Sequence, residues 1–296
     1  MKTGFANLAS ATPIEPATKS SIELTSRVES FAQMRVAIAS GANRVRLDMS
    51  LFKQTQEEKA ELNIESLISA IRFAHGFKCK VSLQLAASSD PARWADIRNA
   101  VQLLASIGVD SLELSDLALI LYCSVHFPQL AIHCLVVDDM NEDNGLFVIY
   151  RQLRISRLVL PHTLASTDLL HAIKSHHIEV EIHSRTRLQP KLGKCNITAP
   201  TRRKEEDSYV ERCATIEAAA NEKVFASSPS ADPNILQQLP KLADLGINAI
   251  TVDPLAPYDG DFARTLQVWR AALDECASNS QRYEIRPDWI RALSNA

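Results

Sequence analysis

The sequence predicts a TIM-like (β/α)8 barrel with an insertion after strand seven and a C-terminal helix. The main observation is a helix-to-strand junction that recurs at Gly41, Gly76, Gly108 and Gly246, each followed by alternating apolar residues. A glycine just past a helix takes the left-handed conformation that caps the last carbonyls, and helices that return repeatedly to strands produce a parallel sheet. The second observation is a set of eight strand-like segments, at 22–26, 44–48, 80–85, 111–115, 131–137, 157–161, 179–184 and 249–253.

Amphipathic helices are expected between these strands, because apolar residues recur there at spacings of three and four. They span 64–75, 94–107, 117–126, 144–153, 168–176 and 234–245. A doubly wound open sheet also alternates strands with helices, but it normally binds a nucleotide through a glycine-rich loop. No two glycines of this chain are separated by a single residue. We therefore favour the closed barrel, which typically needs about 250 residues.

The rest of the composition limits the class of protein. Residues 1–20 are rich in Ala, Ser, Thr and Pro, and Pro13, Glu15 and Pro16 interrupt any apolar run of the length of a secretion signal. We expect a disordered leader over 1–20, a barrel domain over 21–296 that ends in a helical segment over 259–296, and a cytoplasmic location. No stretch approaches eighteen apolar residues, so no membrane span is expected. The formal charge of −3, with both signs interspersed, gives no basic field for nucleic acid.

The spacing of the junctions changes once, after the seventh strand. Gly76 follows Gly41 by 35 residues and Gly108 follows Gly76 by 32, whereas 69 residues separate His177 from Gly246. Loops in α/β units usually have about 2 to 6 residues, so about 35 residues are surplus here.

This surplus forms the predicted insertion at about 185–228. It follows the C-terminal end of strand seven, the side on which barrel enzymes build their active sites. The insertion contains Cys195, Cys213 and a charged run over 202–207, which we interpret as a solvated loop. The six cysteines of the chain are scattered and do not form a secreted disulfide framework.

Several segments, taken in order and at matching spacing, make the chain resemble the collagenase-like peptidase family U32. They are 37–42, 92–94, 112–118, 156–161 followed by Leu164, 193–195 and 268–274. Within that family the chain is similar to UbiU and UbiV, two proteins of oxygen-independent ubiquinone synthesis. The resemblance runs from about residue 22 to residue 293.

The resemblance implies a cofactor, a partner and a reaction. Such proteins hold a four-iron four-sulfur (4Fe-4S) cluster through four cysteines, and Cys195 and Cys213 match the two that lie in or beside the insertion. UbiU and UbiV form a heterodimer that supports hydroxylation of the ubiquinone ring without oxygen, with prephenate as the oxygen source. The resemblance therefore implies a UbiU/UbiV-type partner in a hetero-oligomer, and prephenate or a quinone precursor as a ligand. Protease activity is not expected, because the sequence contains no recognisable protease constellation.

The chain departs from the family pattern at the other two cluster ligands. The UbiU-like pattern has a cysteine seven residues before Cys195, where this chain has Leu188, and another beyond Cys213, where 222–230 contains none. The UbiV-like pattern takes a ligand from the loop after strand two, which reads Met-Ser-Leu at 49–51. A cubane cluster usually needs four thiolates, so two matching cysteines are an incomplete set. The remaining cysteines are expected to be buried structural residues, namely Cys79, Cys123, Cys134 and Cys276.

A second candidate site is independent of the family. Polar residues end several strands on the expected active face, namely Asp48, Gln84, Asp116, Asp138, Asp139, His162, His183 with Arg185, and Asp253. Imidazole nitrogen and carboxylate oxygen are ligands of catalytic divalent ions, and Asp138, His162 and His183 form one such set. The other interpretation, which we favour, is that these residues end strands and cap helices, as Asp116 and Asp168 are placed to do.

Three functions remain open at this stage. The first is a UbiU/UbiV-type role in ring hydroxylation, with a cluster that is incomplete or completed by a partner or a small molecule. The second is a non-catalytic barrel subunit that binds or stabilises a cluster-bearing relative. The third is a divalent-metal-dependent barrel isomerase or hydrolase that uses the strand-end residues.

Overall fold

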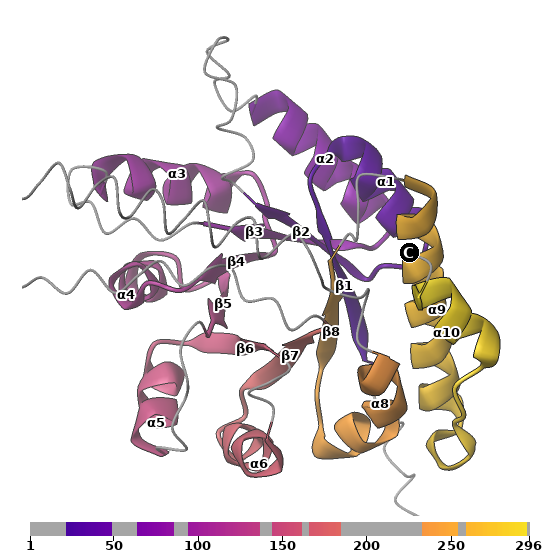
Figure 1. Ribbon diagram of the computed structural model, residues 1–296. Coiled ribbons are helices and arrows are strands. Elements are labelled where there is room, and N and C mark those ends of the chain that lie inside the picture. Colours follow the sequence, from indigo (N-terminus) through magenta and orange to yellow (C-terminus); the bar gives the residue numbers. More distant parts are fainter. Residues whose placement is uncertain are drawn as a thin grey trace, which may run out of the picture.

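In the computed structural model, eight parallel strands close into a barrel, and helices surround it (Figure 1). The structure describes residues 22–48, 64–85, 94–136, 144–161, 166–184, 233–253 and 259–294. The strands follow one another around the barrel in sequence order, and the last pairs with the first through Glu23 and Ala249. The predicted TIM-like (β/α)8 barrel is therefore confirmed, while the predicted leader and the insertion at 185–228 lie outside the described residues.

The strands lie where the alternating segments predict them. They are β1 (Glu23–Val28), β2 (Arg44–Asp48), β3 (Lys80–Gln84), β4 (Ser111–Leu114), β5 (Ala131–Leu135), β6 (Ile155–Pro161), β7 (Glu179–His183) and β8 (Ala249–Val252). The helices between them are α1 (Phe31–Ala39), α2 (Ile64–Gly76), α3 (Trp94–Ser106), α4 (Leu117–His126), α5 (Asn144–Gln152), α6 (Thr167–Ser175) and α8 (Pro233–Leu245). The strand ends differ from the predicted ones by at most two residues, as at β6, which begins two residues before the predicted start at Arg157.

The glycine junctions are confirmed at three positions and wrong at one. Gly41, Gly108 and Gly246 have φ angles of 92°, 86° and 85°, so each is left-handed. Gly76 is instead the last residue of α2, and the left-handed residue of that junction is Lys78, at φ 58°. Helix α2 therefore continues through its glycine, and a lysine makes the turn despite the steric cost of a side chain there.

The two faces of the barrel strands differ in chemistry. The outward face is apolar and packs under the helices, as Val45 and Leu47 do on β2. On the same strand, Arg44 and Arg46 point into the barrel, where they bond to side chains of other strands. Barrel interiors are usually filled by branched aliphatic residues, so a charged interior is the unusual feature of this fold.

The end of the described chain is helical and packs on the side of the barrel. It consists of α9 (Asp259–Ser278), a 3-10 turn (Ser280–Arg282) and α10 (Pro287–Ser294). Helix α9 lies beside α1, and α10 packs on α9 (Figure 1). Trp269 of α9 is fully buried in this layer. Within the described ranges, no helix combines the length and the apolar character that crossing a membrane requires.

Candidate active site

Two arginines bind carboxylates at the N-terminal end of the barrel interior. Arg44 donates from Nε to Glu23 Oε1 over 2.7 Å and from Nη1 to Ser111 Oγ over 2.9 Å. Arg157 donates to the same Glu23 oxygen over 2.9 Å and to Glu179 Oε2 over 2.9 and 2.7 Å. Both guanidinium groups are almost fully buried, so their charges are compensated by carboxylates rather than by water.

Arg46 occupies the centre of the barrel and connects four strands. It donates from Nε to Glu113 Oε1 and from Nη2 to Glu181 Oε1, each over 2.5 Å, and Nη2 also reaches Thr251. Its Nη1 lies 3.2 Å from Nε2 of His183. Because a guanidinium can only donate, Nε2 accepts this bond, and the ring proton of neutral His183 is on Nδ1. The charge at the centre thus fixes the tautomer of a histidine at the end of β7.

The two carboxylates bound to Arg46 have opposite pKa shifts. Burial raises the pKa of Glu113 above its usual value, and the attraction of Arg46 does not reverse this. Burial also opposes ionisation of Glu181, but Arg46 and Arg157 together hold its pKa well below the usual range. Glu113 and Glu181 titrate as a pair, in which Glu181 is the ionised member.

The C-terminal mouth of the barrel, which we define as His183 and Asp253 with Arg46 beneath them, lies at the opposite end of the interior from Glu23 and Glu179. His183 Nδ1 lies 3.8 Å from Asp253 Oδ2, and both side chains are 19% exposed. Burial favours the neutral acid, yet His183 and Arg46 lower the pKa of Asp253 to about 2. The mouth therefore presents a permanent carboxylate beside an imidazole N–H. Among the described residues no group bonds to Asp253 Oδ1, which is a buried oxygen with an unused acceptor site.

Of the predicted strand-end set, Gln84, Asp116, His183 and Asp253 have described side chains, but of the candidate metal set Asp138, His162 and His183 only His183 does. Asp138, His162 and Arg185 lie outside the described residues, as do Cys195 and Cys213. Within the described part of the chain, no three His, Cys, Asp or Glu side chains are grouped as metal ligands.

The capping interpretation holds for one of its two residues. Asp116 caps α4 by accepting from the backbone N–H of Leu119 over 2.8 Å. The cap of α6 is Ser166 and not Asp168, because the Ser166 hydroxyl accepts from the Leu169 N–H and Asp168 lies within the first turn.

The four described cysteines are buried, as predicted. Burial raises the pKa of the Cys79 and Cys134 thiols to about 12 and that of Cys123 to about 11, so all three are protonated at neutral pH. Cluster ligation needs thiolates, and these cysteines lie on separate elements. The described cysteines therefore do not fit a cluster, and Cys195 with Cys213 gives at most half of the usual ligand set.

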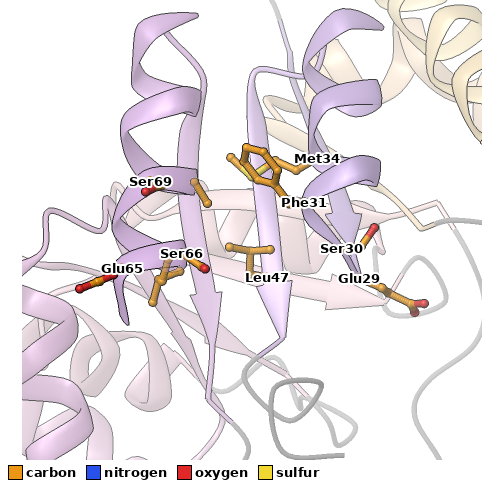
Figure 2. A pocket seen from close by; sticks show the side chains of 10 residues that line it. Glu29, Ser30, Phe31, Met34, Leu47, Glu65, Ser66 and Ser69 are labelled. Atoms are coloured by element: carbon orange, nitrogen blue, oxygen red, sulfur yellow. The ribbon is translucent and has the colours of Figure 1, made fainter. Parts of the chain in front are cut away.

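A separate pocket of about 420 Å³ lies between α1 and α2, outside the barrel wall. Figure 2 shows Phe31 and Met34 of α1 and Leu47 of β2 on its apolar side, with Glu29 and Glu65 at its edges. None of the charged interior residues lines it, so it is distinct from the mouth.

The sequence interpretation missed the interior charges at Arg46, Glu113 and Glu181. A signal was present, because β2 has charged residues at 44, 46 and 48 and β7 has them at 179 and 181, each alternating with apolar residues. Complementary signs at every second position of two strands indicate a charged inner face.

His133 gives the interior a measurable pH dependence. Burial, together with Arg44 and Arg157, lowers the pKa of His133 far below 6.5, so the ring stays neutral in the folded protein. Below pH 6.5 the unfolded chain binds a proton there that the folded protein does not. The free energy of unfolding should therefore fall by about 1.4 kcal/mol per pH unit from this residue. Urea unfolding between pH 5 and 6.5 should show a smaller slope for His133→Gln, whereas His171→Gln at an exposed position should keep the wild-type slope.

The fold and this mouth define an α/β barrel with ionisable groups at the C-terminal ends of β7 and β8, the usual place for barrel chemistry. A sequence profile described as Peptidase family U32 matches residues 29–296. The chain belongs to this family.

One solved structure supports the barrel, and two others are similar to the chain at lower TM-scores. A glycerophosphodiester phosphodiesterase from Parabacteroides distasonis superposes with a TM-score of 0.50 at 11% identity, covering 86% of this chain and 99% of that one. The U32 peptidase Mk0906 gives a TM-score of 0.48 at 12% identity over 84% of this chain and 98% of its own. A putative fructose-1,6-bisphosphate aldolase from Coccidioides immitis gives a TM-score of 0.45 at 12% identity, and the match covers 93% of this chain and 84% of the aldolase chain. At these identities the comparison concerns the fold alone.

Proposed function

We propose that this U32-family protein is a component of oxygen-independent ubiquinone ring hydroxylation, of the UbiU/UbiV type, and that it acts at the mouth of the barrel. The observation that carries the proposal is the position of the mouth. His183 ends β7 beside Asp253, and the segment 185–228 with Cys195 and Cys213 follows directly in the sequence. The cysteines of the family pattern thus follow the mouth residue His183 directly in the sequence.

The described residues of the mouth can form hydrogen bonds with a hydroxylated ring or with a carboxylate-bearing oxygen donor such as prephenate. The Asp253 carboxylate, which its low pKa keeps ionised, accepts a hydrogen bond from a ligand hydroxyl. Arg46 holds the His183 ring in one tautomer, so the ring presents the same N–H to the mouth in each cycle. Fixed donors and acceptors of this kind cost no reorganisation when the ligand binds.

The cluster that the family resemblance implies is not fully supplied by this chain. We propose that Cys195 and Cys213 contribute two thiolates, and that a UbiU/UbiV-type partner supplies the remaining ligands in a hetero-oligomer. The buried Cys79 and Cys123 offer an internal control, because their thiols are protonated and lie in other parts of the fold.

The test is the iron and acid-labile sulfide content of the protein isolated with its bound partners from its native cells grown without oxygen. We expect both elements in the wild-type assembly, their loss in Cys195→Ser/Cys213→Ser, and their retention in Cys79→Ala/Cys123→Ala. An assembly that forms without iron would contradict the redox role and favour a non-catalytic binding subunit. A divalent ion without sulfide would favour a metal-dependent isomerase or hydrolase.

A further inference from the structure

We propose that the barrel interior binds one proton on Glu113 at neutral pH, so that this residue is a buried neutral acid beneath the mouth. This goes beyond the proposed function, because it assigns a proton-binding site to a residue of the barrel centre. The protonation itself is independent of the reaction at the mouth. Only the use of Glu113 as a proton store for that reaction rests on the proposed function.

The first argument is the unequal pairing of the two carboxylates at Arg46. Glu181 accepts from Arg46, from Arg157 over 2.9 Å and from the hydroxyl of Thr251. Glu113 is bonded only through Oε1 to Arg46 in the described structure, and its side chain is fully buried. Of two carboxylates that share one guanidinium, the one with fewer donors holds the proton more tightly.

The second argument is the balance of buried charge. Glu113 and Glu181 are both fully buried and both bond to the one guanidinium of Arg46. Arg157 also donates to Glu181. One proton on Glu113 removes the carboxylate charge that has no further guanidinium of its own, and an uncompensated buried charge is strongly unfavourable.

The third argument is a complementary pair of buried atoms. Neither Glu113 Oε2 nor His133 Nδ1 has a hydrogen-bond partner among the described residues. These two residues are register partners on β4 and β5. A protonated Oε2 is a donor and a neutral Nδ1 is an acceptor. A proton on Glu113 therefore allows a hydrogen-bonded link between the two atoms, for example through one buried water.

The other groups that face this pair act on Glu113 in opposite directions, and burial is the largest effect. Burial and the repulsion of Glu181 favour the neutral acid, while Arg46 and His183 favour the ionised form, and the pKa of Glu113 is raised as a result. Around His133, Arg44 and Arg157 disfavour a second positive charge. The proton therefore stays on the carboxyl and does not move to the imidazole.

Infrared spectroscopy tests the proposal directly, because a neutral carboxyl has a C=O stretching band that carboxylates lack. At pH 7 the difference spectrum of wild type against Glu113→Gln should contain this band. The matched control is Glu275→Gln, which removes a glutamate bonded to Arg286 over 2.6 Å in a more exposed position. Its difference spectrum should contain carboxylate bands alone. Carboxylate bands alone in the Glu113→Gln difference would overturn the proposal.

Thermal unfolding supplies a second test that does not depend on activity. Glutamine resembles a neutral glutamic acid, so Glu113→Gln should melt near the wild-type temperature at about pH 4.5 and above it at pH 7, whereas Glu181→Gln should melt well below the wild type at pH 7. The unfolded chain releases the Glu113 proton near pH 4.5, while the folded protein keeps it. Relative to Glu113→Gln, the wild type should therefore lose melting temperature as the pH rises above 4.5. A wild type that gains stability over the variant in this range would contradict the proposal.

Discussion

Replacing Arg46 by methionine is expected to lower the free energy of unfolding by about 3–5 kcal/mol. The substitution leaves Glu113 and Glu181 in the barrel centre without the guanidinium that bonds both of them over 2.5 Å. It also removes the donor that faces His183. Urea unfolding at pH 7 measures the loss.

The control for this prediction is Arg286→Met at the surface. Arg286 is bonded to Glu275 over 2.6 Å, but its side chain is 59% exposed. Exposed ion pairs contribute at most about 1 kcal/mol, so this variant should unfold close to the wild type. A similar small loss for Arg46→Met would show that the interior charges do not depend on Arg46.

Trp269→Ala is expected to cost about 3–5 kcal/mol through the cavity that it leaves. Trp269 is fully buried on α9, the helix that packs against α1, α8 and β1. Thermal and urea unfolding should both show the loss.

Trp269→Phe separates packing from polarity at the same position. Within the described structure, the indole N–H of Trp269 has no hydrogen-bond partner. Phenylalanine keeps much of the apolar volume and removes this buried donor, so the Phe variant should be far more stable than the Ala variant. Equal losses in the two variants would mean that the ring does not fill the space between α9 and the barrel.

The barrel could be predicted from the sequence because its signals are local. The left-handed glycines at 41, 108 and 246 and the alternating apolar residues after them are set by neighbours within a few positions. At other junctions the left-handed residue is not a glycine but Lys78, Arg154 or His177. The residue types at those positions do not predict a left-handed turn.

The interior charges could not be paired from the sequence because their partners are distant. Arg46 and Glu181 are 135 residues apart, and only closure of the barrel brings them together. A single charged residue in a strand also resembles a solvent-facing one, so Glu113 gave no indication that it is buried. His183 could be recognised because strand ends of a barrel converge on one face, whereas its contact with Arg46 depends on that closed geometry.

The measurement that tests the account most directly is the ubiquinone content of cells grown without oxygen, determined by mass spectrometry after the native copy of this protein is removed. Wild type should restore ubiquinone, and Asp253→Asn at the mouth should reduce it by at least about tenfold, because the fixed negative charge that accepts a hydrogen bond from the ligand is lost. The matched control is Asp274→Asn, an exposed aspartate bonded to Arg270, which should restore ubiquinone fully. Full restoration by Asp253→Asn would contradict a reaction at the mouth, and failure of the wild type to restore ubiquinone would contradict the proposed function itself.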